Sequence, residues 1–433
     1  MTLTADRTLD EALKAAEARY AAARPRSRER HEAASAFMPG GNTRSVIHFS
    51  PFPFAVERAQ GQFLHDIDGH RYTDFLGEFS AGIYGHSHPA IMAAVREALG
   101  DGLSFGAPNR YEAELAEAIC RRFPSCEMVR FCNSGTEANL MALATARAAT
   151  GRDKVIVMEG GYHGSVLKFA GGGAVTNVPY PYLLAHYNDL PGTLSLIEQH
   201  ADTVAALLIE PLMGSSGCIA AEPAFLAGLR AATRRHGIVL IFDEVMTSRL
   251  APGGLQEALG VTPDMTTFGK YMGGGFSFGA FGGARELMTL YDPQLAQGLM
   301  HAGTFNNNVV SMKAGLTGLR DVYTAAEVAA LNRRGEWFRG ELNRVAMSRQ
   351  VGIQAVGQGS MMALHFQRGP IDRPADVRPE PAKRALLHLG MLEAGFYMAR
   401  RGFMTLSLAL EPADYDGYLS AFDVFCVEHG DVI

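Results

Sequence analysis

The stretch MVRFCNSGTEANLMALATARAATGRDKVIVM, residues 128–158, carries the pattern that decides the fold class. Its two ends, residues 128–132 and 154–158, are short apolar runs, and both predict strands. Residues 135–149 between them are rich in alanine and predict a helix. A strand, a helix and a second strand in this order are typical of a parallel sheet.

The same alternation continues on both sides of this stretch. Helices are expected at residues 89–99, 110–122 and 223–236, and strands at 204–210 and 238–242. We therefore expect an α/β fold whose large domain has a mostly parallel, doubly wound sheet. Helices dominate again after residue 324, with strands near 360–366 and 403–408, which predicts a smaller α+β domain.

The N-terminal segment is expected to pack against this smaller domain, because chain termini often lie close together. Residues 8–23 predict an amphipathic helix that ends at Arg24-Pro25, and residues 63–75 predict a hairpin. The expected division is an N-terminal segment, a large domain and a C-terminal small domain. Their bounds are residues 1–66, 67–325 and 326–433.

Composition excludes several classes of protein. The 433 residues are 47% hydrophobic and 19% charged, as in an ordinary globular enzyme. A net charge of −6 argues against a nucleic-acid partner. The five cysteines form no CxxC pair, so neither a zinc cluster nor any other metal site is expected. No apolar run approaches the roughly 18 residues of a membrane span, and the N-terminal residues lack the apolar stretch of a secretory signal. A cytoplasmic enzyme with no membrane partner is therefore expected.

In open α/β sheets, ligands bind at the carboxyl ends of the strands. Residues Ser134, Gly135 and Thr136 follow the first strand and open a helix. Ser134 and Glu137 have the spacing of a capping box. The free N–H groups of a helix start also suit a phosphate, and a cap can be shared with one.

Other strand ends carry further candidates. Tyr162 and His163 lie between glycines after residues 154–158, either in an ordinary loop or as a surface for a flat cofactor. Asp243 and Glu210 each follow a very apolar strand. Such acids either cap a turn or pair with a buried cation such as a protonated ring nitrogen.

Lysine is scarce, because only six of the 39 basic residues are lysines. Lys270 has uncharged neighbours and is followed by Gly273, Gly274 and Gly275. A desolvated lysine has a lowered pKa and can form a Schiff base. A phosphate turn, a stacking ring, an acid for a pyridine nitrogen and such a lysine are the parts that pyridoxal 5'-phosphate requires.

The ordered motifs resemble those of class III aminotransferases of fold type I. They are SGTEA (134–138), GGYHG (160–164), EP (210–211), FDEV (242–245), GK (269–270) and HAGTFNNN (301–308). Within the class, the chain is similar to the branch that holds β-phenylalanine aminotransferases and glutamate-1-semialdehyde aminomutases. It departs from many relatives at Met213, where a glutamine is usual.

The resemblance implies a role for each motif. Lys270 would form the Schiff base with the cofactor and move the reacting proton, and Asp243 would keep the pyridine nitrogen protonated. Tyr162 and Val245 would contact opposite faces of the ring, and His163 and Glu210 would also belong to the cofactor-binding residues. Ser134, Gly135 and Thr136 would hold the phosphate. Thr304 would reach the phosphate of a second subunit, which makes the enzyme a homodimer with shared active sites.

The implied activity is transfer of an amino group from a β-amino acid, an aromatic one, to a 2-oxo acid such as 2-oxoglutarate or pyruvate. The alternative is a 2,1-aminomutase of the glutamate-1-semialdehyde type. Two arginines in suitable loops, Arg44 and Arg401, are expected to bind the substrate carboxylates, because a guanidinium binds a carboxylate through two hydrogen bonds.

Overall fold

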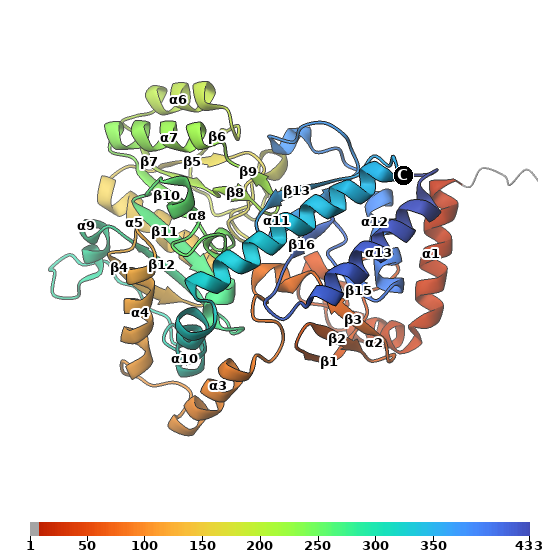
Figure 1. Cartoon of the computed structure of the whole chain (residues 1–433). Helices are drawn as coiled ribbons and strands as arrows, with labels where there is room; N and C mark the ends of the chain where they lie inside the picture. The colour runs from red at the N-terminus through yellow and green to blue at the C-terminus, as the bar shows by residue number, and fades with distance from the viewer. Residues whose placement is uncertain (1–7) are drawn as a thin grey trace, which may run out of the picture.

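The computed structural model describes residues 8–433, and its centre is a seven-stranded sheet (Figure 1). In spatial order the strands are β4 (Met128–Cys132), β12 (Gly279–Gly283), β11 (Met265–Gly269), β10 (Val239–Asp243), β7 (Val204–Ile209), β5 (Lys154–Met158) and β6 (Tyr182–Ala185). β12 runs antiparallel to both of its neighbours, and the other six strands share one direction. The predicted mostly parallel α/β sheet is confirmed.

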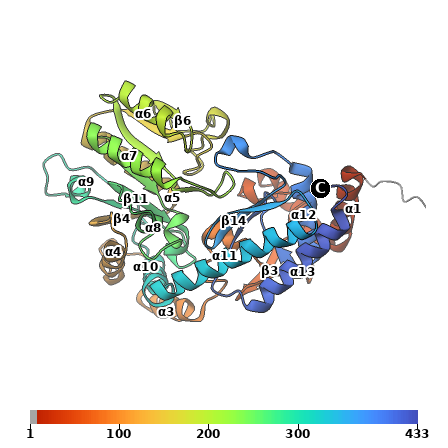
Figure 2. The ribbon, with the colours of Figure 1, turned by 45° about the horizontal axis from the view of Figure 1, so that its top comes forward.

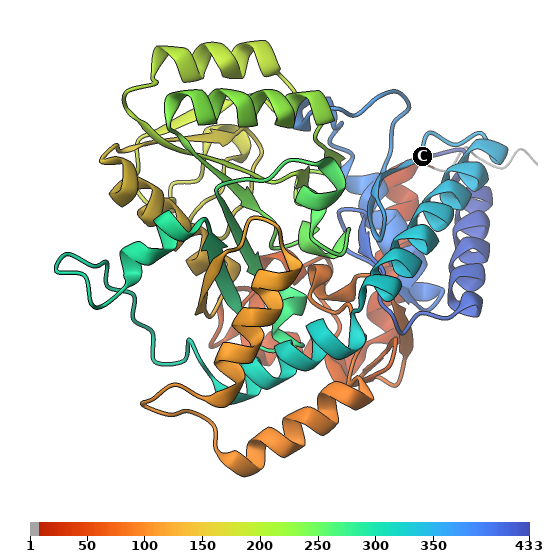
Figure 3. The ribbon, with the colours of Figure 1, turned by 60° about the vertical axis from the view of Figure 1, so that its left-hand side comes forward.

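Helices cover both faces of this sheet because its strands are apolar on both sides. On β5, Val155 and Val157 pack in one cluster with α5 (Gly135–Thr150), whereas Ile156 and Met158 pack on the other face. That face is covered by α7 (Pro223–His236) and α6 (Leu190–Gln199), which lie side by side in Figure 3.

Strands β6, β11 and β12 were not predicted. β12 has the sequence Gly-Ala-Phe-Gly-Gly, which has little strand propensity. The glycines are required by close packing, because a Cβ at Gly279 would lie 2.2 Å from the Ser134 carbonyl oxygen. At Gly283 it would lie 2.4 Å from the carbonyl oxygen of Asp264.

Several shorter elements border the large sheet. Three helices pack together below it in Figure 1: α3 (Pro89–Asp101), α4 (Arg110–Arg122) and α10 (Val309–Thr317). The remaining short elements are α8 (Leu255–Leu259), α9 (Arg285–Met288), β8 (Leu212–Met213) and β9 (Ile219–Ala220).

The long helix α11 (Ala325–Ser348) leads from this region to the C-terminal part of the chain (Figure 2). That part contains the sheet of β13 (Gln354–Gln358), β14 (Met361–His365) and β16 (Phe403–Thr405), with helices α12 (Pro381–Glu393) and α13 (Pro412–His429).

The N-terminal segment packs against α12. Helix α1 (Leu9–Ala23) ends as predicted, and its Arg19 binds Glu393 of α12 at 2.9 Å. It is followed by α2 (Pro25–Ser35) and by the strands β1 (Val56–Gln60), β2 (Phe63–Asp66) and β3 (Arg71–Asp74). β3 pairs with β15 (Phe396–Tyr397), so residues 56–74 share a sheet with the C-terminal part. The expected boundary at residues 66/67 falls within the β2–β3 hairpin, and the domain division stays a prediction.

Within residues 8–433, no helix combines the length and the apolar character that a membrane span needs.

Candidate active site

Five strands of the large sheet bring the candidate residues to one edge, because parallel strands end on the same side. β4 ends before Ser134, β5 before Tyr162, β7 before Glu210, β10 at Asp243 and β11 before Lys270. Residues that are up to 136 positions apart (270 − 134) therefore meet at the carboxyl edge of the sheet.

The turn after β4 is shaped as a helix start. The Ser134 hydroxyl accepts a hydrogen bond from the Glu137 N–H at 3.2 Å. The Glu137 carboxylate accepts one from the N–H of Asn133, at 2.6 Å, rather than from Ser134 as in a capping box. The Ser134 cap therefore forms, and the first N–H groups of α5 remain directed at the sheet edge.

This turn lies against the loops that follow β10 and β11. A Cβ on Gly135 would lie 2.9 Å from the methyl groups of Val245, and one on Gly269 would lie 3.2 Å from the same side chain. A Cβ on Gly164 would lie 2.2 Å from the Thr136 hydroxyl. This packing brings Ser134–Thr136 into contact with Val245 and with Gly269, the residue before Lys270. The glycines leave the backbone accessible at that point.

Asp243 is buried at the end of β10, and its carboxylate is held by three groups. Oδ2 accepts hydrogen bonds from Nδ1 of His163 and from the side-chain amide of Asn139, each at 2.8 Å. Oδ1 accepts one from the Val245 N–H at 3.0 Å. A carboxylate is acceptor-only, so His163 carries its proton on Nδ1, and its buried Nε2 has no partner among the described residues.

Asn139 was missed by sequence reasoning. It lies on α5, binds Asp243, and donates a second hydrogen bond to the His163 carbonyl at 3.1 Å. Its own oxygen accepts a hydrogen bond from the Thr267 hydroxyl at 2.7 Å. An asparagine inside an alanine-rich helix has no sequence signature of this role, because only the tertiary structure places β10 and β11 beside it.

The neighbouring acid, Glu244, binds the start of α8 instead. It is fully buried and accepts hydrogen bonds from the N–H groups of Leu255 and Gln256, at 2.6 and 3.0 Å. The Gln256 side chain and the Thr247 hydroxyl donate two more. Glu244 is thus occupied in fixing the start of α8, whereas Asp243 faces the candidate site.

Glu210 positions the loop that carries Tyr162. Its carboxylate accepts hydrogen bonds from the N–H groups of Tyr162, at 3.0 Å, and Gly214, at 3.2 Å. Burial raises the pKa of Glu210 to about 7, and Asp243 acts in the same direction. Tyr162 remains 38% exposed, so its ring is accessible to a ligand while Glu210 fixes its backbone.

Lys270 follows β11 directly and has a left-handed backbone conformation, with φ of 54°. Such conformations are strained for residues other than glycine and cluster at functional sites. Burial lowers the pKa of Lys270 to about 8, an effect that Asp243 opposes and Arg44 and Arg401 reinforce. The neutral amine that a nucleophile or base needs is thus accessible near neutral pH.

Two arginines approach Lys270 from other elements. Arg44, in the N-terminal loop, forms an exposed ion pair with Glu78. Its guanidinium lies 5.5 Å from the centre of the Phe79 ring, and that of Arg401 lies 5.3 Å from the same ring. A cavity of about 350 Å³ with an apolar wall, including Val46, Phe79 and Ala399, lies beside them.

The turn that presents Phe79 is strained. Glu78, Phe79 and Ser80 have φ values of 50°, 54° and 80°, three successive left-handed residues without a glycine among them. Sequence reasoning missed Glu78 and Phe79, and nothing in their residue types marks this conformation.

Thr304 lies in the exposed loop before α10. Asn306 of this loop accepts a hydrogen bond from the Asn133 side chain at 2.8 Å, directly before Ser134. The loop borders an open cavity of about 590 Å³ whose wall includes Asn109, Arg130 and His301. The loop that carries Thr304 therefore borders the turn before Ser134 of its own subunit, and Thr304 itself is exposed.

Comparison with known proteins agrees with this geometry. The family model described as Aminotransferase class-III matches residues 47–395. The β-phenylalanine transaminase of Variovorax paradoxus is 46% identical over 423 residues, which are 98% of this chain and 97% of that protein. The glutamate-1-semialdehyde 2,1-aminomutase of Rhodopirellula baltica is 40% identical over 404 residues, 89% of this chain and 92% of its own length.

The fold agrees equally well with a solved structure. The crystal structure of a β-phenylalanine aminotransferase from Variovorax paradoxus has a TM-score of 0.96 to this chain, with 46% identity and 98% of both chains covered.

Proposed function

This chain belongs to the class III aminotransferases, which depend on pyridoxal 5'-phosphate, and we propose that it transfers the amino group of an aromatic β-amino acid to a 2-oxo acid. The relative from Variovorax paradoxus supports this substrate class, because it is a β-phenylalanine transaminase that matches almost the whole chain.

The residues at the sheet edge fit this cofactor. Asp243 is a buried carboxylate whose charge acts on the Lys270 amine. Within residues 8–433 its one ion-pair partner is His163, which is charged only if protonated. The turn at Ser134–Thr136 offers hydroxyl groups and free N–H groups beside glycines, which suits a phosphate. Tyr162 offers an exposed aromatic face, which suits a planar ring.

When bound, pyridoxal 5'-phosphate supplies an electron sink for the carbon that loses a proton. The Asp243 carboxylate keeps a proton on the pyridine nitrogen, and His163 and Asn139 hold that carboxylate in place. The Lys270 amine would accept the proton from the amine-bearing carbon of the donor and deliver it to the cofactor carbon that takes over the amino group. Ser134, Gly135 and Thr136 would hold the phosphate, and Val245 and Tyr162 would contact the ring.

The substrate assignment rests on Arg44 and Arg401, whose guanidinium groups both lie beside the Phe79 ring. A β-amino acid has its carboxylate one carbon further from the amine than a 2-oxo acid has from its keto group, so one arginine cannot serve both in the same way. Arg44 binds the carboxylate of the β-amino acid, and Arg401 binds that of the 2-oxo acid. The apolar cavity next to Phe79 accepts the aromatic group.

The active form is a homodimer with shared sites. Thr304 is exposed in the loop before α10. Its hydroxyl and N–H bind the phosphate held by the partner subunit.

The proposal is tested by initial rates with matched donors: 3-amino-3-phenylpropanoate, phenylalanine and a terminal amine, each with and without 2-oxoglutarate. The β-amino acid should be preferred and should require the 2-oxo acid. Turnover of a substrate without any external acceptor would favour the aminomutase alternative.

Preference for phenylalanine, whose carboxylate lies one carbon nearer the amine, would reject the β-amino acid class.

The two carboxylate sites are separated by measuring the donor and acceptor half-reactions of the variants Arg44→Ala and Arg401→Ala. Arg44→Ala should weaken the donor half by about 2–5 kcal/mol, and Arg401→Ala should weaken the acceptor half by a similar amount.

A further inference from the structure

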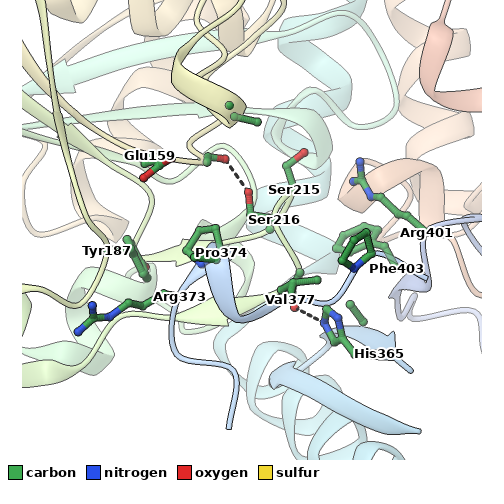
Figure 4. A pocket seen from close by; sticks show the side chains of 18 of the residues that line it. Glu159, Tyr187, Ser215, Ser216, His365, Arg373, Pro374, Val377, Arg401 and Phe403 are labelled. Carbon is green, nitrogen blue, oxygen red and sulfur yellow. Dashed lines mark hydrogen bonds between the residues drawn. The ribbon is translucent and has the colours of Figure 1, made fainter. Parts of the chain in front are cut away.

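A cavity of about 590 Å³ lies next to the Lys270 site, on the side of β14 and β16 (Figure 4). Gly160 and Gly214, in the two loops that Glu210 organises, form part of its wall. Figure 4 shows Arg401 above Phe403, with its guanidinium directed toward Ser215. This cavity therefore opens onto the same arginine that the proposed function assigns to the 2-oxo acid.

A second arginine, Arg384 of α12, lines this cavity together with Arg401, and the same two residues also line the smaller apolar cavity. Neither arginine forms an ion pair with a carboxylate among residues 8–433, and the Nε atom of each is buried without a hydrogen-bond partner. Burial lowers the pKa of Arg384, and Glu380, one helical turn earlier, opposes this effect without forming an ion pair with it.

Burial lowers the pKa of both guanidinium groups, and the charge of Arg384 lowers that of Arg401 further. Two half-buried cations that repel each other and form no ion pair within residues 8–433 are costly, and at Arg401 the charge of Glu210 offsets only part of that cost. An anion with two negative groups in the cavity would relieve that cost.

His365 holds Arg384 in this position. Its Nε2 lies 2.9 Å from the Gly217 carbonyl oxygen, to which it donates (Figure 4). Nδ1 is then the acceptor, and it receives a hydrogen bond from Nη2 of Arg384 at 3.4 Å. Burial lowers the pKa of His365, which keeps the ring neutral and the acceptor available.

We propose that Arg384 binds the distal carboxylate of the amino acceptor, so that the enzyme selects dicarboxylic 2-oxo acids over monocarboxylic ones. The inference rests on the proposed function, in which Arg401 binds the carboxylate next to the keto group. Arg384 then discriminates between 2-oxoglutarate and pyruvate, because only the former has a second carboxylate.

The test measures the acceptor half-reaction of the holoenzyme with 2-oxoglutarate and with pyruvate. Arg384→Gln should lower kcat/KM for 2-oxoglutarate about 30-fold or more, and change that for pyruvate by less than about threefold. Arg384→Lys keeps the charge but not the planar fork, and should give an intermediate loss.

Arg373 supplies a matched control, because it lines the same cavity but is exposed. In Figure 4 its guanidinium points away from Arg401. Arg373→Gln makes the same change of charge, and both acceptors should react as in the unmodified enzyme.

A binding measurement makes the result independent of turnover. Glutarate should bind the holoenzyme more tightly than butyrate by calorimetry, and Arg384→Gln should remove that difference. Parallel losses with both acceptors, or equal binding of glutarate and butyrate to the unmodified enzyme, would overturn the proposal. The donor half-reaction with 3-amino-3-phenylpropanoate is measured in the same variants, so failure of the β-amino acid assignment appears there and leaves the acceptor result interpretable.

Discussion

Asp243 and His163 form a buried pair, in which Nδ1 of the imidazole lies 2.8 Å from the Asp243 carboxylate. The two residues come from the ends of β10 and β5, and Asn139 of α5 donates to the same carboxylate oxygen. Three separate segments therefore fix the orientation of one negative charge. The position of the Asp243 charge therefore depends on how β10, α5 and the loop after β5 pack together.

Replacement of Asp243 by asparagine should slow the chemistry far more than it weakens the cofactor. The variant keeps the shape but removes the charge that holds a proton on the pyridine nitrogen. We expect kcat to fall on the order of 10²-fold or more, the scale of losing one preorganised electrostatic contact. Steady-state kinetics and a titration with pyridoxal 5'-phosphate measure the two effects separately.

Glu244→Gln is the matched control for Asp243→Asn, because it makes the same change at the next residue. Glu244 accepts four hydrogen bonds within the fold, so this variant should lower the free energy of unfolding by about 1–3 kcal/mol. Its kcat should change little. A larger catalytic loss in Glu244→Gln than in Asp243→Asn would reverse the assignment of the two acids.

The Lys270 amine should control the pH dependence of cofactor uptake. Its pKa is lowered to about 8, so the reactive neutral form is lost below that pH and predominates above it. The rate at which cofactor-free protein acquires the absorbance of the bound cofactor should rise through about pH 8.

Charges around Lys270 set that midpoint, and their removal gives signed shifts. Arg44→Gln and Arg401→Gln each remove a positive charge that lowers the pKa, so the midpoint should move to higher pH. Asp243→Asn should move it lower. Lys270→Ala should abolish the uptake signal and reduce transamination beyond the roughly 10²–10⁴-fold contribution of acid–base catalysis. Near-normal transamination by Lys270→Ala would exclude this lysine.

The shared site predicts complementation between two inactive variants. Lys270→Ala lacks the amine, and Thr304→Glu would repel the phosphate in the partner subunit. In a hybrid dimer, the intact Lys270 and the intact Thr304 meet at one of the two sites, so an equal mixture should regain about a quarter of full activity. Activity of the mixture no higher than that of the separate variants, or full activity in a monomer detected by sedimentation, would contradict the shared site.

Glu78 should compete with the substrate for Arg44. The two side chains form an exposed ion pair, which is a weak interaction. Glu78→Gln should therefore lower the KM for the β-amino acid by about two- to fivefold and leave the KM for the 2-oxo acid unchanged. An increase in the donor KM would show that Glu78 holds Arg44 in place instead.

The strand and helix pattern was predictable wherever local preference and tertiary packing agree. The strands Met128–Cys132 and Lys154–Met158 and the helices at 110–122 and 223–236 have the predicted bounds, because their residues favour the conformation that they adopt. β12 was not predictable, since its glycines are required by the neighbouring backbones rather than by strand preference.

The candidate site follows the same rule. Asp243 could be proposed from its position after an apolar strand, and Lys270 from its uncharged neighbours and the glycines that follow it. The family resemblance reinforced both. Asn139 could not, because its partners Asp243 and Thr267 come from distant strands. The left-handed turn at Glu78–Ser80 could not either, since its strain is imposed by the surrounding fold and not by residue type.

The most direct test of β-amino acid transamination is a single-turnover measurement on the holoenzyme with 3-amino-3-phenylpropanoate and no acceptor. We expect that the absorbance of the bound cofactor changes once and that one 3-oxo-3-phenylpropanoate forms per active site. Addition of 2-oxoglutarate should then restore the starting spectrum with release of glutamate. Continued turnover without the 2-oxo acid, or no spectral change with this donor while an α-amino acid reacts, would contradict it.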